Sequence, residues 1–263
     1  ILFIAICISL YYYQTLAKTQ KLQKEVLLQS IKAQESEEMK ASFIKSICHE
    51  IRTPLNSING FSEILSNDIS TPEEQEDYQA IILENTRLLT SLLGSLVEVA
   101  NLDSLTENFT LTPIEIGSYC RAEMQYLKEA EGKQEIDYQL DLPENDYKVY
   151  SHPQYFSLLL RALLNNANKF TTQGFINLSC RKDNKRKMLL VSITDTGCGI
   201  PAEKHEYVFR RFTKLDIFKQ GSGLGLYLCK LIIKHMQGDI YIDETYTKGS
   251  RFIFTLPMEE TKK

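Results

Sequence analysis

Apolar side chains in the first quarter of the chain recur with the helical period. Between residues 14 and 66, Gly60 and Pro54 are the only glycine and proline. The apolar positions fall three, four or seven residues apart, which places them on one helical face: Ile44, Ile47, Ile51, Leu55, Ile58 and Leu65. Residues 14–40 are richer in Gln, Lys and Glu, so we expect a helical or coiled-coil linker there.

A second helix is predicted from Pro72 to about Leu102. Ser70 and Thr71 are good N-cap residues, Pro72 suits the first turn, and two glutamates follow. The apolar positions again form one stripe: Ile81, Leu88, Leu92, Leu96 and Val99. Two long helices joined by a short turn form an αα-hairpin. One hairpin cannot bury both stripes, so we expect a homodimer that forms a four-helix bundle.

After about Leu105 helices alternate with short runs of period two, which predicts an α+β layer of helices on a mixed sheet. We therefore place the hairpin at 41–105 and the α+β domain at 106–263. The expected helices are 114–131, 153–169 and 222–236, and the expected strands are 136–142, 147–151, 175–181, 188–194, 239–243 and 251–256.

The N-terminal segment is strongly apolar. Residues 1–13 carry no charge, and as a helix they would cover roughly 20 Å of a hydrocarbon core about 30 Å thick. Tyr11–Tyr13 would lie at the headgroup level, and three lysines, the first at Lys18, follow before any acid. This order favours the truncated inner end of a membrane helix over a signal peptide, whose charges precede the apolar run. A frayed or core helix is the alternative.

Charge and cysteine usage exclude several classes of protein. The chain has 30 Lys and Arg against 34 Asp and Glu, a net charge of -4, so it lacks the basic footprint of a nucleic-acid-binding protein. The six cysteines stand singly, without a C-x-x-C pair, which is typical of reduced thiols. The four histidines are also scattered, so we expect no structural metal cluster.

The first candidate for chemistry is His49. It lies two residues from the apolar positions on either side, so at about 100° per residue its side chain faces water. A solvent-facing imidazole can act as a nucleophile, and Glu50 can hydrogen-bond one ring nitrogen and leave the other free. Thr53 lies one turn further along the same face. Pro54 cannot donate to the carbonyl of Glu50, so we expect a bend there. Taken alone, a surface histidine on a helix is far more often an ordinary solvated side chain than a nucleophile.

Two further strings offer groups for a nucleotide and its metal ion. Asn165 and Asn166 end an apolar helix, and their amide oxygens suit a hard cation, while Lys169 can reach a phosphate. Asp195 ends a strand and can accept a hydrogen bond from the exocyclic amine of a base. Two glycines follow it and let a flat ligand approach the backbone. Taken singly, the first string is also typical of a polar helix end and the second of a turn.

A glycine-rich turn, Gly221–Leu226, opens the predicted helix 222–236. Free N–H groups at a helix start bind anions, and Ser222 can cap the helix. A Rossmann unit is not evident here, and no Gly-Lys-Ser/Thr follows as in a Walker loop. Upstream, two aromatic residues within Val208–Lys214 anchor a segment that leads into the loop 215–220. This loop can close over a nucleotide.

Together and in this order, the strings resemble the transmitter region of sensor histidine kinases of two-component systems. The H box is matched by SFIKSICHEIRTPL, the N box by LLNNANKFT, and the first glycine box by DTGCGIP. The F box is matched by VFRRFTKL, the second glycine box by GSGLGL, and the closing hairpin by KGSRFIFTLP. The resemblance covers roughly residues 40–258. The loop near 218–221 is most similar to hybrid kinases of Bacteroidetes type.

The resemblance implies a fold, an activity and cofactors. It implies an all-α dimerisation hairpin followed by a two-layer α+β Bergerat-type ATP-binding sandwich, with ATP and Mg²⁺ as cofactors. His49 would be phosphorylated, Glu50 would serve as base or orienting group, and Thr53 would position water for dephosphorylating the partner. Asn166 would hold the metal, Asp195 would read the adenine amine, and the implied nucleotide-binding residues are Asn165, Asn166, Lys169, Asp195, Gly197, Gly199, Lys214, Gly221, Ser222, Gly223, Leu224 and Gly225.

The resemblance also implies partners. The phosphohistidine would donate its phosphoryl group to an aspartate of a response regulator receiver domain, which lies on another chain or has been cut away. The homodimer would be anchored to the membrane through the N-terminal segment, with this region on the cytoplasmic side of the inner membrane. No nucleic-acid partner is expected.

The chain departs from the family pattern at Ala162, where another asparagine is usual. Metal or phosphate binding is then weaker, or Asn165 compensates. Three alternatives stay open. Another Bergerat-fold ATPase would turn over ATP without His49, a non-catalytic dimeric scaffold would gain no stability from nucleotide, and a phosphatase-biased protein would use Thr53.

Overall fold

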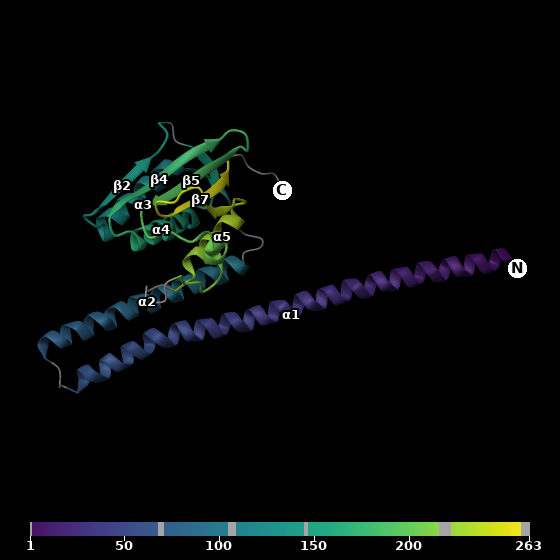
Figure 1. Ribbon diagram of the computed structural model, residues 1–263, viewed down its shortest axis with the longest axis horizontal. Helices are drawn as coiled ribbons and strands as arrows, with labels where there is room; N and C mark the ends of the chain where they lie inside the picture. Colours follow the sequence, from purple (N-terminus) through teal and green to yellow (C-terminus); the bar gives the residue numbers. More distant parts are fainter. Residues whose placement is uncertain (1, 68–70, 105–108, 145–146, 216–221, 259–263) are drawn as a thin grey trace. The chain divides into compact units, whose positions relative to one another are not determined.

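The computed structural model describes residues 2–67, 71–104, 109–144, 147–215 and 222–258 (Figure 1). It divides into two compact units, Ile1–Thr53 and Pro54–Lys263. The first unit is helical throughout its described residues. The second contains the rest of the hairpin and the whole α+β domain.

Two long helices make up the hairpin. Helix α1 runs from Leu2 to Ser66 with Pro54 inside it, and α2 runs from Pro72 to Ser104. The predicted helix start is confirmed, because Thr71 and Glu74 form a reciprocal capping box. The Glu74 amide donates to Thr71 Oγ1 at 3.3 Å, and the Thr71 amide donates to Glu74 Oε2 at 2.8 Å. This second hydrogen bond also lowers the pKa of Glu74.

The α+β domain contains a five-stranded mixed sheet of order β2-β4-β5-β7-β6, in which β2 and β4 are parallel and the other pairs antiparallel. The short strands β1 and β3 form a separate antiparallel pair. The elements are β1 (Thr112–Glu115), α3 (Ile116–Glu131), β2 (Ile136–Asp141), β3 (Lys148–Ser151), α4 (Pro153–Phe170), β4 (Gly174–Asp183), β5 (Met188–Asp195), η1 (Ala202–Lys204), η2 (Tyr207–Phe209), α5 (Gly225–His235), β6 (Ile240–Ile242) and β7 (Arg251–Pro257).

The predicted two-layer arrangement is confirmed. Helix α4 contacts α3 and α5 and lies against β4 and β5, so the helices form a layer on the sheet (Figure 1). Alternate side chains of the strands meet the apolar stripe of α4, and the rings of Phe156 and Phe254 pack edge to face at 6.2 Å. The apolar faces of the strands and of α4 thus meet in one core, and the C-terminal end of α4 is held against the sheet.

The structure differs from the expected elements at two larger points, besides shifts of one or two residues at other ends. Strand β1 was not expected, because it is only four residues long and contains Pro113. The helix expected from Ser222 begins at Gly225 instead, because Gly223 has a φ of +66° and a left-handed residue cannot continue a helix.

One helical stretch within the described residues, Pro72–Leu102, is long and apolar enough to cross a membrane when judged by length and composition alone. Helices that bury an apolar stripe against another protein pass the same test. The side chains of residues 1–13, the predicted membrane end, lie outside the described part of the structure.

Candidate functional site

His49 presents its imidazole to solvent, as its position in the pattern predicts. The side chain is 76% exposed, and the neighbouring Glu50 side chain is 23% exposed. Their closest atoms, His49 Nδ1 and Glu50 Oε1, lie 4.0 Å apart, which is an ion-pair distance and too long for a hydrogen bond. The Thr53 hydroxyl donates to the His49 carbonyl at 3.3 Å. The ring is therefore accessible, with one carboxylate beside Nδ1.

Asp195 is the most enclosed of the predicted polar site residues. It ends β5, is 2% exposed, and one of its oxygens, Oδ1, accepts two backbone hydrogen bonds. The donors are the Gly197 amide at 2.9 Å and the Ser250 amide at 3.1 Å. Burial raises the pKa of Asp195, against the lowering effect of these two hydrogen bonds. Since both donors use Oδ1, the other oxygen remains available to accept from a ligand.

Two glycines allow three chain segments to converge on Asp195. A Cβ atom on Gly197 would lie 2.5 Å from the Phe170 carbonyl oxygen, at the end of α4. A Cβ atom on Gly249 would lie 2.1 Å from the Asp195 carbonyl oxygen. Only glycine fits such close backbone approaches. The C-terminal end of α4 and the loop before β7 thereby lie next to Asp195.

The three asparagines at the end of α4 have different environments. Asn165 and Asn166 are half-buried, and within the described residues neither amide has a hydrogen-bond partner. Among those residues no group of three or more His, Cys, Asp or Glu gathers to hold a metal ion. A cation at this place would therefore rest on amide oxygen and on oxygens of its ligand, which suits Mg²⁺ bound with a polyphosphate. The free amides of Asn165 and Asn166 fit that requirement.

Asn168, by contrast, is locked into the fold. It is buried, its Oδ1 accepts from the Tyr138 hydroxyl at 2.7 Å, and its Nδ2 donates to the Glu131 carbonyl at 3.0 Å. Lys133 Nζ donates to the carbonyl of Asn168 and, at 2.8 Å, to that of Thr171. A cation that binds the last carbonyls of a helix also interacts favourably with the helix dipole. This network fixes the final turn of α4, which carries Lys169.

Lys169 and Lys214 complete the predicted cationic groups. Lys169 is exposed, and its ammonium nitrogen lies 5.1 Å from the centre of the Phe170 ring. Lys214 is half-buried at the end of the segment that follows η2. Both side chains lie at the surface of the domain, where long cations can reorient toward a phosphate.

The glycine-rich turn differs from its prediction. Ser222 Oγ accepts from the Leu224 amide at 3.3 Å, so Ser222 stabilises the turn before α5 rather than capping the helix. Residue 223 has to be glycine for two reasons. Its backbone is left-handed, and a Cβ atom there would lie 2.8 Å from the Phe212 Cα. Gly225, the first residue of α5, has open space beside it. Gly199 also has a positive φ, and Gly221 lies outside the described residues.

Several residues of the site were missed by reasoning from the sequence. Ser250 and Gly249 were assigned only to a closing hairpin, although they hold Asp195. Lys133 and Tyr138 lie more than 25 residues from the asparagines they support, and nothing in their local pattern indicates it. Their roles come from long-range contacts.

Two family models match the chain. Residues 39–105 match the His Kinase A (phospho-acceptor) domain, and residues 152–260 match the Histidine kinase-, DNA gyrase B-, and HSP90-like ATPase. The first match contains His49, and the second contains Asn166, Asp195 and the glycine-rich turn. The two matches fall on the hairpin and on the α+β domain.

Known proteins that are similar to most of this chain are named as sensor proteins. Sensor protein EvgS of Escherichia coli (strain K12) is 30% identical over 256 residues, which are 94% of this chain and 21% of EvgS. Sensor protein SrrB of Staphylococcus aureus (strain NCTC 8325 / PS 47) is 33% identical over 235 residues, which are 85% of this chain and 39% of SrrB. The chain thus spans less than half the length of these relatives.

Solved structures share the fold. The histidine kinase ThkA in complex with the response regulator protein TrrA superposes with a TM-score of 0.68 at 24% identity, over 83% of this chain and 61% of that chain. This likeness concerns the fold alone.

Proposed function

We propose that the chain, which carries the transmitter region of a sensor histidine kinase, phosphorylates His49 with ATP. It then passes the phosphoryl group to an aspartate of a response regulator. The phosphoacceptor domain precedes the ATPase domain in the chain. The observation that carries the proposal is the solvent-exposed imidazole of His49 inside the phosphoacceptor match. An exposed ring beside one carboxylate can be deprotonated at one nitrogen and attack with the other.

The groups around Asp195 supply nucleotide binding. Its second oxygen accepts from the exocyclic amine of adenine, and Gly197 lets the loop after Asp195 pack closely on the end of α4. The open space at Gly225 and the N–H groups that begin α5 suit the phosphates. Lys169 and Lys214 swing toward the triphosphate and bind its oxygens.

Asn166 would hold Mg²⁺ through its amide oxygen, with Asn165 beside it as the compensating group for Ala162. When bound, Mg²⁺ would neutralise charge on the triphosphate oxygens. The hydrogen bonds of Asn168 fix the final turn of α4, which directly follows Asn165 and Asn166.

The chemical step is an in-line phosphoryl transfer. A ring nitrogen of His49 forms the N–P bond, the bond from the γ-phosphorus to the bridging oxygen breaks, and ADP leaves. Glu50, 4.0 Å from Nδ1, accepts the ring proton or orients the ring. The phosphoramidate then donates to a receiver-domain aspartate. Thr53, one turn from His49, would position the water that hydrolyses the regulator's phosphoaspartate and releases phosphate.

The proposal extends to assembly and location. A second copy covers the exposed apolar face of α2, which carries Leu83, Leu93 and Val97, giving a four-helix bundle in the homodimer. Residues 1–13 form the inner end of a membrane helix, which keeps this region on the cytoplasmic side of the inner membrane. The response regulator is the partner by analogy with the ThkA–TrrA complex.

The test is incubation with γ-labelled ATP and Mg²⁺, comparing the wild type with His49→Gln. Lys45→Gln, an exposed residue one turn earlier on α1, is the matched control. We expect acid-labile, alkali-stable label on the wild type and the control, no label on His49→Gln, and equal ATP affinity in all three. Label that persists in His49→Gln contradicts the assignment. ATP turnover without any protein label indicates another ATPase, and no nucleotide binding indicates a scaffold.

A further inference from the structure

Two thiols from different elements lie in contact inside the α+β domain. Cys120 on α3 and Cys180 on β4 are 60 residues apart in the chain, yet their sulfur atoms lie 3.7 Å apart. Both residues are buried, at 0% and 5% exposure. A disulfide has an S–S distance of about 2.05 Å, so the sulfurs need to approach by less than about 2 Å.

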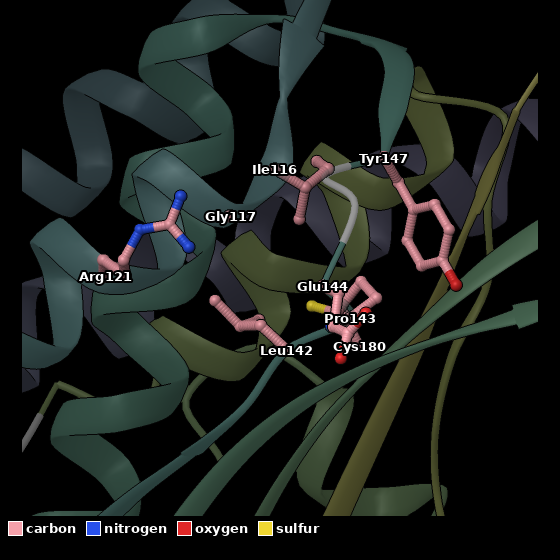
Figure 2. Close-up of a pocket in the computed structure, with 8 residues that line it drawn as sticks. All are labelled: Ile116, Gly117, Arg121, Leu142, Pro143, Glu144, Tyr147 and Cys180. Carbon is pink, nitrogen blue, oxygen red and sulfur yellow. The ribbon is translucent and has the colours of Figure 1, made fainter.

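A small cavity leads to one of the two thiols and not to the other. Its volume is about 50 Å³, and Cys180 lies in its wall between α3 and the segment after β2. Figure 2 shows the Cys180 sulfur among the lining groups, which also include the Arg121 guanidinium, the Glu144 carboxylate and the Tyr147 hydroxyl. A water molecule needs roughly 10–15 Å³ by this measure. The cavity therefore admits a polar molecule slightly larger than water.

We propose that Cys120 and Cys180 are an oxidation site that takes hydrogen peroxide and closes to a reversible disulfide. Cys180 is the thiol that reacts with peroxide first, because it lines the cavity and Cys120 does not. Cys120 is the resolving thiol, because it is fully buried and already in contact with that sulfur.

The chemistry balances in two steps. The Cys180 sulfur attacks one peroxide oxygen, the O–O bond breaks, and the products are a sulfenic acid and one water, which takes up the thiol proton. The Cys120 sulfur then attacks the Cys180 sulfur, the S–O bond breaks, and a second water leaves with the Cys120 proton. In sum, two thiols and one peroxide give one disulfide and two waters.

The other described cysteines lack this combination. Cys48 and Cys198 are exposed, and Cys229 is buried. Burial raises the pKa of Cys229 to about 12, which suppresses its thiolate. Among the residues that the structure describes, no other two thiols are in contact. Oxidation elsewhere would therefore stop at a sulfenic acid or join two chains.

The cross-link would constrain the part of the domain that carries the candidate nucleotide site. The chain between Cys120 and Cys180 contains the whole of α4, and α3 packs against α4. Tying α3 to β4 therefore reduces the freedom of the helix that bears Asn165 and Asn166. We expect the oxidised protein to unfold roughly 5–10 °C higher than the reduced protein.

The test exposes the reduced, folded protein to graded hydrogen peroxide, blocks the remaining thiols and maps the peptides without reductant. We expect a Cys120–Cys180 peptide pair two hydrogens lighter than the separate thiols, and its loss on treatment with dithiothreitol. A variant with Cys48→Ser and Cys198→Ser is expected to form the pair equally well. The proposal is overturned if those exposed cysteines are oxidised while Cys120 and Cys180 stay reduced, or if the pair forms only in denaturant.

Single variants separate the two roles. In Cys120→Ala the Cys180 sulfenic acid is expected to persist and to react with dimedone, whereas in Cys180→Ala no dimedone label is expected at Cys120. Circular dichroism shows whether each variant is folded, and Cys→Ser versions replace any that are not. Dimedone labelling of Cys120 in Cys180→Ala contradicts the assigned order.

Discussion

The hairpin and the α+β domain satisfy their apolar residues in opposite ways. On α2, Leu83, Leu93 and Val97 lie on one face and are 51%, 48% and 57% exposed. In the α+β domain the large core side chains, such as Phe156 and Phe254, are fully buried by the same chain. The domain therefore completes its own core, whereas the hairpin presents an exposed apolar face, which a second copy would cover in the proposed homodimer. Substitutions on the exposed apolar face of the hairpin should therefore disrupt assembly and leave nucleotide binding intact.

The largest effect is expected from a charge on that face. Leu93→Asp would bury an unpaired carboxylate in two symmetric copies and remove about 2 kcal/mol of apolar burial from each. The dimer dissociation constant should rise on the order of a thousandfold, measured by sedimentation over a range of concentrations. ATP affinity should not change.

Ser91→Asp, an exposed position about 200° away on α2, is the control and should leave the dimer intact. A wild type that is monomeric at micromolar concentration, or a control that dissociates as readily, would remove the basis for the comparison.

A change at Asp195 should do the reverse, weakening nucleotide binding while leaving assembly intact. In Asp195→Asn the amide oxygen must take the place of Oδ1, because two backbone N–H groups donate there. The NH₂ group then faces the adenine amine, and two donors meet without an acceptor. We expect ATP affinity to fall about 100-fold, or about 2.7 kcal/mol, by calorimetry.

Asp137→Asn, on the exposed face of β2, is the matched control and should bind ATP normally. A loss of less than threefold in Asp195→Asn would mean that this carboxylate does not read the base.

The asparagines of α4 sharpen the contrast within the domain. Asn168→Leu leaves the Tyr138 hydroxyl and the Glu131 carbonyl without their partner, so the free energy of unfolding should fall by about 2 kcal/mol in urea titrations. Asn165→Ala removes an amide with no partner among the described residues, so stability should stay the same while Mg²⁺-dependent ATP affinity falls. Equal destabilisation by both variants would contradict the division of roles.

The smallest effect concerns pH. His152 lies in a ring cluster with Phe109, Tyr155 and His235, and its Nδ1 is buried without a partner. Burial lowers the pKa of His152, so below the ordinary histidine pKa the unfolded chain binds more protons than the folded one. Stability should therefore fall as pH drops from 7.5 to 5.5, by less than about 1 kcal/mol.

The variant His152→Phe should be less sensitive to pH over this range. Burial, and after it Glu98, raises the pKa of the neighbouring Tyr155, so that hydroxyl does not titrate in this range. An unchanged pH slope in His152→Phe would show that His152 is not the source of the effect.

A feature of the structure could be predicted from the sequence where its cause lies in neighbouring residues of the chain. The alternation in β7 and the stripe of α4 predicted the core, because strand and helix periods are properties of neighbouring residues. The start of α5 was wrong because a positive φ at Gly223 overrides a helical pattern. The hydrogen bond from Ser250 to Asp195 and the support of Asn168 could not be predicted, because these partners lie 30 or more residues away.

The main-chain clamp on Asp195 also bears on how such a site can change over evolutionary time. Its two donors are peptide groups of Gly197 and Ser250, so replacing the Ser250 side chain leaves the donor in place. What cannot vary is the path of the chain, which demands a glycine at 197 and 249 and forbids proline at 250. The site can therefore drift widely in composition while its nucleotide preference is inherited through backbone shape.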